Sequence, residues 1–87
     1  MITLAVTRPD QKLSSLGTAT HRVGGVVVGE FGSLKVCRYA DEGGVYLLYL
    51  DPAGNEVTDT FHDEIDGALA QANFEFGITR DAWLFNS

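Results

Sequence analysis

The stretch from Val45 to Ile78 constrains the fold most, because it reads as strand, turn, strand and helix in direct succession. Residues 45–50, Val-Tyr-Leu-Leu-Tyr-Leu, are aliphatic or aromatic, which is typical of a buried strand. The following Asp-Pro-Ala-Gly predicts a type I turn, since proline presets φ at the second position and Gly54 tolerates positive φ. Residues 56–61 then return as a second strand.

Residues 63–76 predict an amphipathic helix. Asp63 is a suitable N-cap, and Asp66 three residues later resembles a capping box. Gly77 is the expected stop, because glycine tolerates the left-handed conformation that closes many helices. The apolar positions recur at spacings of three and four, as a buried helix stripe requires: Ile65, Leu69, Ala72 and Phe76.

Two further strands are predicted before this stretch, at residues 25–31 and 34–40, with an additional N-terminal strand at residues 2–6. Gly32-Ser33 suits a two-residue hairpin turn. The sequence therefore predicts a single α+β domain over residues 1–87: a four-stranded antiparallel meander followed by one helix packed on one sheet face.

Short turns predict which residues lie opposite one another. The turn at Gly32-Ser33 would pair Val28 with Cys37, and a turn at residues 41–44 would pair Tyr39 with Tyr46 and Cys37 with Leu48. Because side chains alternate along a strand, one face would collect Val27, Phe31, Leu34, Val36, Leu47, Tyr49 and Val57.

The helix is expected on the face of Leu34, Val36, Leu47, Tyr49 and Val57. The opposite face is also apolar and needs another cover, either the chain termini or a second molecule. As a homodimer surface it would present Val28, Cys37, Tyr39, Tyr46 and Leu48.

Charge is distributed unevenly along the chain. Residues 39–79 contain no lysine or arginine, whereas the net charge of the whole chain is −6. Such a surface repels nucleic acid and anionic membrane and attracts basic partners, although acidic surfaces also simply aid solubility. The expected partner-binding surface consists of acidic residues and one histidine: Asp41, Glu42, Glu56, Asp59, His62, Asp63, Glu64 and Asp66.

The cluster around His62 is also the best candidate for chemistry. A small metal-dependent enzyme would use His62 with Asp59, Asp63 and Asp66, but the spacing matches no zinc or calcium pattern, and helix capping explains the acidic residues equally well. Cys37 lies mid-strand, where burial makes a thiol unreactive. No catalytic, metal or cofactor residues are therefore assigned, and the chain is not expected to be an enzyme.

Residues 45–83 resemble a group of short bacterial proteins without established activity. The resemblance rests on the tyrosine-rich strand, the Asp-Pro-Ala-Gly-Asn hairpin, the Asp-Thr-Phe-His step and the helix end Phe-Glu-Phe-Gly-Ile. It implies a bacterial origin and a sheet-plus-helix fold, and it implies no activity. Small acidic domains of this kind also occur as immunity proteins beside toxins, an analogy that rests on size and charge alone.

These observations predict a non-enzymatic protein-binding or regulatory module, either monomeric or homodimeric, with no cofactor. An immunity-like, toxin-neutralising protein is the alternative, followed by the metal-dependent enzyme. One cysteine, the absence of a signal peptide pattern and the absence of a long apolar run favour the cytoplasm.

Overall fold

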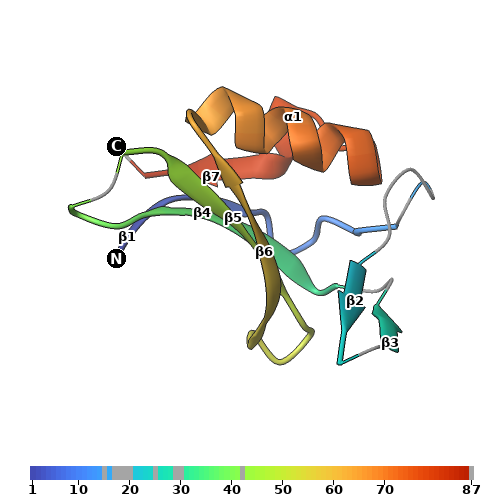
Figure 1. The fold of residues 1–87 in the computed structure, drawn as a ribbon. Helices are drawn as coiled ribbons and strands as arrows, with labels where there is room; N and C mark the ends of the chain where they lie inside the picture. Colours follow the sequence, from blue (N-terminus) through green and yellow to red (C-terminus); the bar gives the residue numbers. More distant parts are fainter. Residues whose placement is uncertain (15, 17–20, 25, 29–30, 42, 87) are drawn as a thin grey trace.

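The structure is a computed structural model that describes residues 1–14, 16, 21–24, 26–28, 31–41 and 43–86, with the backbone alone at 21–23 and 26–28. Its elements follow one another as shown in Figure 1: β1 (Ile2–Thr7), β2 (His21–Val23), β3 (Val26–Val28), β4 (Ser33–Arg38), β5 (Val45–Leu50), β6 (Glu56–His62), α1 (Ile65–Phe76), the short 3-10 turn η1 (Arg80–Ala82) and β7 (Trp83–Phe85).

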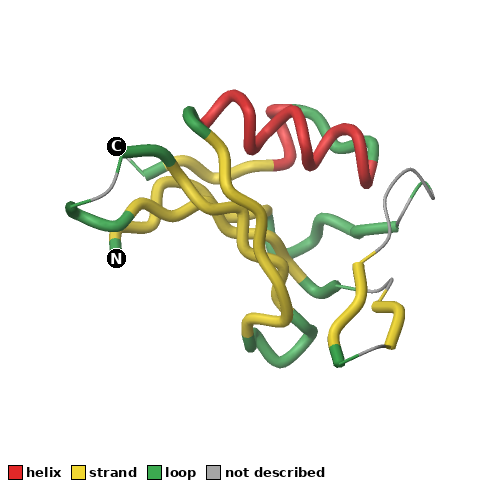
Figure 2. Tube along the Cα trace, in the orientation of Figure 1, coloured by secondary structure: helices red, strands yellow, loops and turns green. Residues whose placement is uncertain are grey.

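Five of the strands form one antiparallel sheet in the order β6-β5-β4-β1-β7, and α1 lies across one face of it (Figures 1 and 2). The predicted α+β class, with one helix on an antiparallel sheet, is confirmed. The N-terminal strand is also confirmed, and it lies inside the sheet between β4 and β7.

The predicted place of the strand at 25–31 is wrong. Its described part, Val26–Val28, pairs with β2 in a separate two-stranded hairpin, so that Val28 lies opposite His21 and not Cys37. The place beside β4 belongs to β1, where Val6 lies opposite Lys35.

Gly32, where a two-residue hairpin turn is predicted, instead lies against the β5–β6 turn. Its N–H donates to the Leu50 carbonyl at 2.8 Å. A Cβ atom at Gly32 would come within 2.6 Å of the Pro52 Cα atom. The chain at Gly32 is therefore held against the neighbouring hairpin end, and Ser33 already belongs to β4.

The turn between β4 and β5 is longer than predicted. β4 ends at Arg38 and β5 begins at Val45. Cys37 lies opposite Tyr46, so the expected pairs of Cys37 with Leu48 and of Tyr39 with Tyr46 are both wrong. The shift is by two residues and leaves every side chain on its predicted face, because side chains alternate with a period of two.

The turn between β5 and β6 forms at the predicted residues. Gly54 has a φ of 89°, and its N–H donates to the Asp51 carbonyl at 2.9 Å. The Asp51 carboxylate accepts from the N–H groups of Ala53 and Asn55 at 3.0 and 2.9 Å. An aspartate that satisfies neighbouring amides in this way stabilises a tight turn.

The helix begins two residues later than predicted. Its N-cap is Glu64, which makes no side-chain capping hydrogen bond, so the assignment of Asp63 as N-cap is wrong. The predicted end is confirmed: Gly77 has a left-handed φ of 69°, and its N–H donates to the Asn73 carbonyl at 2.8 Å.

The main core lies between α1 and the predicted sheet face. Phe31 contacts the rings of Tyr49 and Phe76, with centroids 5.2 and 6.1 Å apart. Trp83 is 3% exposed and joins the core from the edge strand β7. The buried members of this core are Ala5, Phe31, Leu34, Val36, Val45, Leu47, Tyr49, Ala68, Ala72, Phe76, Ile78, Ala82 and Trp83.

Candidate functional site

The sheet face opposite α1 carries a line of three aromatic side chains, which we call the aromatic row: Tyr39, Tyr46 and Phe61. Tyr46 and Phe61 are cross-strand partners on β5 and β6, with ring centroids 5.2 Å apart and planes at 68°. Tyr39, just after β4, meets Tyr46 at 5.3 Å and 78°. These distances and angles are those of favourable edge-to-face contacts.

Much of the aromatic row is accessible to solvent. Phe61 is 51% exposed and Tyr39 is 38% exposed, and Tyr46 is partly buried between them. Among the described residues, no helix covers this face, which we call the open face. The aromatic row is therefore an accessible apolar surface held in place by ring–ring contacts.

Beside the aromatic row, the same sheet face has a small buried cluster of its own: Cys37, Leu48 and Leu50, packed against Tyr46. Of the residues predicted for a dimer surface, Tyr39 and Tyr46 thus line the accessible surface, whereas Cys37 and Leu48 are 0% and 3% exposed. Val28 belongs to the separate β2–β3 hairpin, and its side chain lies outside the described atoms. Burial raises the pKa of the Cys37 thiol, which keeps it in its unreactive form.

The predicted acidic residues do not form one cluster. Glu56 and Asp59, which we call the carboxylate pair, interact on the exposed surface, and the pKa of Glu56 is raised by burial, by its hydrogen bond to Asp59 and by repulsion from Asp59. Asp66 pairs with Arg80 at 3.5 Å. Asp41 is exposed in the β4–β5 turn, and Glu42 lies outside the described residues.

His62 lies on the helix side of the sheet, opposite Val45, whereas Asp59 lies opposite Leu48 on the open face. Asp59 therefore does not join His62 as a metal-dependent enzyme would require, because an odd separation along a strand puts two side chains on opposite faces. Around His62 the structure instead forms an open hollow of about 540 Å³, lined by Phe61, His62, Asp63, Glu64 and Gly67.

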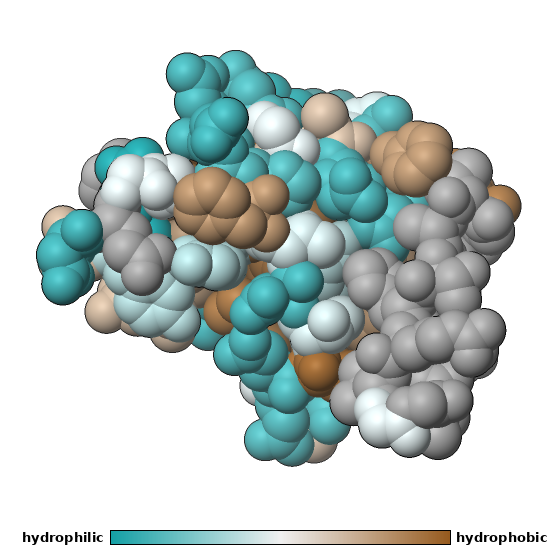
Figure 3. All heavy atoms as spheres, in the orientation of Figure 1, coloured by the Kyte–Doolittle hydropathy of each residue, from teal (hydrophilic) through white to brown (hydrophobic). Residues whose placement is uncertain are grey.

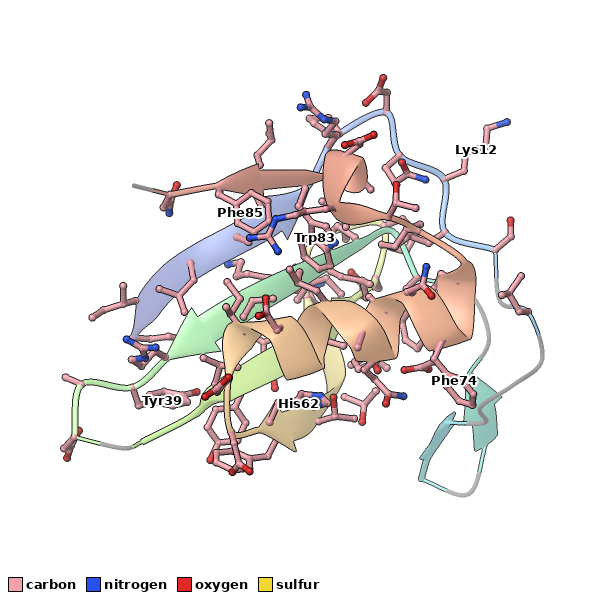
Figure 4. The ribbon with its side chains drawn as sticks, turned by 90° about the horizontal axis from the view of Figure 1, so that it is seen from above. Lys12, Tyr39, His62, Phe74, Trp83 and Phe85 are labelled. Carbon is pink, nitrogen blue, oxygen red and sulfur yellow. The ribbon has the colours of Figure 1, made fainter. Side chains whose placement is uncertain are left out.

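The imidazole of His62 is fixed within this hollow. Its Nε2 atom lies 2.8 Å from the Thr60 hydroxyl oxygen. A Cβ atom at Gly67 would lie 3.4 Å from the His62 Cβ atom, so the first turn of α1 passes closely over the ring. Burial lowers the pKa of His62, and the nearby Asp63 and Glu75 oppose that effect more weakly. Figure 4 shows His62 beside the helix, away from Phe74 near the C-terminal end of α1.

A buried polar contact that the sequence analysis does not predict lies beneath the helix. Glu75 is only 2% exposed and accepts hydrogen bonds from the Tyr49 hydroxyl and, at 2.9 Å, from the Gln71 amide. The pKa of Tyr49 is raised, first by burial and then by its hydrogen bond to Glu75. The helix spacing does carry a signal, because Glu75 follows the buried Ala68 and Ala72 by seven and three residues and so lies on the same helix face.

Two kinds of feature are absent from the described residues. Within that part of the chain, no group of three histidine, cysteine, aspartate or glutamate side chains is placed to hold a metal ion. Over the same residues, no helix has the length and hydropathy of a membrane span. In the view of Figure 3, hydrophobic residues form separate patches within a largely hydrophilic surface.

Comparison with protein-family models, with curated proteins and with known structures finds no match for this chain. The resemblance carried by residues 45–83 therefore contributes nothing to the functional argument, which depends on the open face and on the hollow beside His62.

Proposed function

We propose that this chain is a non-enzymatic protein-binding module whose contact surface is the aromatic row on the open face. The observation that carries the proposal is the exposure of Phe61 and Tyr39, at 51% and 38%, within one continuous set of ring contacts. Isolated exposed apolar residues are ordinary, whereas aromatic residues grouped on one face are typical of protein interfaces.

Charge supports a basic partner. The carboxylate pair lies on exposed positions of β6, the strand that contributes Phe61, and Asp63 and Glu64 follow directly after β6. Between Tyr39 and Thr79 the sequence has no lysine or arginine, so this stretch contributes only negative charge. A basic surface on the partner would meet complementary charge here, which accelerates association and weakens binding to anionic competitors.

The test compares two phenylalanines of nearly equal exposure. Phe61 is 51% exposed in the aromatic row, and Phe74 is 53% exposed on α1. Each of three proteins, the wild-type chain, Phe61→Ala and Phe74→Ala, is used as bait for affinity purification from cell extract. The wild-type chain and Phe74→Ala should recover the same partners, and Phe61→Ala should lose them. Recovery should fall as the salt concentration rises. Equal recovery with Phe61→Ala, or recovery of nothing by the wild-type chain, would contradict the proposal. Unfolding curves for each variant verify that the fold is intact.

An immunity-like role is one form of this proposal, in which the basic partner is a toxin. The analogy of size and charge supports this role. The wild-type chain and Phe74→Ala are then expected to suppress the toxic activity of the partner, and Phe61→Ala is expected to suppress it less. Location in the cytoplasm remains part of the proposal, and the free thiol of Cys37 is compatible with a reducing compartment.

The enzyme alternative would have to use the hollow, since Asp59 lies on the other sheet face and Asp66 pairs with Arg80. That leaves His62, Asp63 and Glu64 around the opening. Isothermal titration of divalent ions into the wild-type chain and into His62→Ala tests this alternative. Uptake that His62→Ala abolishes would favour the enzyme reading over the binding module.

A further inference from the structure

The hollow beside His62 brings an aromatic ring, an imidazole, two carboxylates and a stretch of bare backbone to one place. These groups belong, in chain order, to Phe61, His62, Asp63, Glu64 and Gly67. The volume of about 540 Å³ lies within the range of sites that hold small ligands. The hollow can therefore accommodate a group larger than a water molecule, and its walls determine which group.

The ring of Phe61 is the aromatic wall of the hollow. A Cβ atom at Gly44 would lie 2.5 Å from Cζ of Phe61 and 2.8 Å from the carbonyl oxygen of His62. The tip of the ring therefore lies over the end of β6, where the chain passes into α1. Phe61 is also 51% exposed, so the ring remains accessible to a ligand in the hollow.

Gly67 leaves space beside the imidazole. A Cβ atom at this position would lie 3.4 Å from Cβ of His62 and 3.6 Å from its Nδ1 atom, which are ordinary contact distances. Packing therefore has room for alanine, although alanine suits a helix better than glycine. While Nε2 of His62 contacts the Thr60 hydroxyl, Nδ1 has no hydrogen-bond partner within the described part of the chain. Nδ1 can thus serve a ligand in the hollow.

The charges around the hollow select a cation. Asp63 and Glu64 are exposed, and Glu64 makes no side-chain capping hydrogen bond, so the helix does not use its carboxylate. The helix N-terminus carries about half a positive charge, which the two full negative charges outweigh. An anion would be repelled by both carboxylates, and an aromatic wall attracts a cation more strongly than a neutral group.

We propose that the hollow binds one organic cation, an ammonium or guanidinium group on an aliphatic stem. The cation lies against Phe61 and pairs with the carboxylates of Asp63 and Glu64. One of its N–H groups donates to Nδ1 of His62, whose Nε2–H donates to Thr60. The inference rests on the protein-binding role proposed above, which makes a lysine or arginine side chain of the partner the source of the cation.

The test titrates defined probes into isotopically labelled chain at low ionic strength and follows backbone amide shifts. The probes are the Nα-acetyl methylamides of lysine, arginine, norleucine and glutamate, and free pentylamine. Norleucine keeps the aliphatic stem of lysine and lacks its ammonium group. We expect the lysine and arginine probes to shift Asp63, Glu64 and Gly67 and to bind about three- to tenfold more tightly than norleucine, as a cation–π contact and a surface ion pair together supply. The glutamate probe should bind most weakly.

Matched variants identify the groups responsible. Gly67→Ala should weaken the lysine probe about threefold or more by placing a methyl group beside Nδ1, and it should leave Tm unchanged or higher. Gly43→Ala, whose Cβ atom would meet nothing within 4 Å, should change neither. Glu64→Gln should weaken the probe about two- to fivefold, whereas Asp10→Asn, at an exposed position outside the hollow, should not.

The outcomes distinguish this inference from the function on which it rests. Equal affinity for the lysine and norleucine probes, unchanged binding by Gly67→Ala, or shifts centred outside the hollow would overturn the cation site. Tighter binding of pentylamine than of the lysine probe would overturn a partner side chain as the source. Tyr39 belongs to the aromatic row and does not line the hollow. Loss of partner recovery in Tyr39→Ala would support the binding module even where the cation site fails, and recovery that Tyr39→Ala and Phe61→Ala both retain would refute that module.

Discussion

The buried hydrogen bond between Tyr49 and Glu75 offers the sharpest test of the packing beneath the helix. Tyr49 is completely buried, Glu75 is 2% exposed, and the Tyr49 hydroxyl is one of the donors to the Glu75 carboxylate. Replacing Tyr49 by Phe keeps the ring and its contacts with Phe31 and Phe76 but removes that donor.

The expected cost follows from the charge of the acceptor. A hydrogen bond to an ionised group contributes about 1.5–3 kcal/mol, so Tyr49→Phe should lower the free energy of unfolding by about 2 kcal/mol. For a domain of this size, that corresponds to a fall in Tm of roughly 8–16 °C. Glu75→Gln makes the acceptor neutral, and in that background Tyr49→Phe should cost only about 0.5–1.5 kcal/mol.

Urea unfolding, followed by the fluorescence of the buried Trp83, measures these differences in a double-mutant cycle. Tyr39→Phe is the matched control, because it removes a tyrosine hydroxyl at a residue that is 38% exposed and should change stability by less than about 0.5 kcal/mol. Equal effects of Tyr49→Phe and Tyr39→Phe, or strict additivity of Tyr49→Phe and Glu75→Gln, would refute the reasoning. Since the pKa of Tyr49 is raised in the folded state, the contribution of its hydroxyl to stability is complete below about pH 10 and is lost as the pH rises further. The free energy of unfolding of Tyr49→Phe should not show this decline at alkaline pH.

Three further predictions concern single groups. Because folding lowers the pKa of His62, its contribution to stability is present above about pH 6.5 and is lost as the pH falls through the pKa of the folded state. His62→Gln should therefore flatten the decline in Tm between about pH 6.5 and 5. An unchanged decline would contradict the burial of the ring. Cys37 is fully buried, so a thiol reagent should not react with the native chain in the time that it needs to react fully in denaturant. Rapid reaction of the native chain would show that the Cys37 thiol is accessible and would contradict its burial. Gly32→Ala should destabilise the fold by about 1–3 kcal/mol in urea, since its Cβ atom would meet the backbone of Pro52 at 2.6 Å. Gly43→Ala, whose Cβ atom meets nothing within 4 Å, should cost less than about 0.5 kcal/mol, and equal costs would refute the close approach.

Local patterns in the sequence predict the second half of the fold well. The turn at Asp51, the end of the helix at Gly77 and the sheet face that the helix covers are all confirmed, because each depends on residues close together in the chain or on strict alternation. The start of the helix is misplaced by two residues, since Asp63, Glu64 and Asp66 are all acceptable near a helix N-terminus and only tertiary packing selects among them.

Non-local pairing is where the sequence reading fails. Residues 25–31 and 34–40 look like a hairpin because they are adjacent and are separated by Gly32-Ser33. The structure instead pairs β4 with β1, about thirty residues earlier in the chain. Alternation along residues 2–6 shows that they suit a strand but contains no information about which strand they join, so the preference for adjacent pairing gives the wrong answer.

The candidate site is predicted in part. Tyr39 and Tyr46 are correctly assigned to the open face, and their mutual contact survives the register error because that error is an even number of residues. The place of Phe61 on the open face, opposite Tyr46, is not predicted, because the register of β5 and β6 shifts between Tyr49 and Leu50 and the turn residues do not reveal that irregularity. The predicted acidic residues all carry negative charge but are divided among the open face, the β4–β5 turn and the start of α1. Composition does not reveal where in the fold each of them lies.

The position of β1 makes one side of the sheet depend on segments far apart in the sequence. β7 pairs with β1 through Ala5, Val6 and Thr7, and the Asn86 amide also donates to the Thr3 carbonyl at 2.7 Å, so contacts across some 80 positions of sequence complete one side of the sheet. The β4–β5–β6 hairpins can form early from neighbouring segments, but the N-terminal strand must find β4 and then receive β7. Contacts between such distant segments slow folding, and while β1 is unpaired the edge of β4 that it occupies lacks a neighbouring strand.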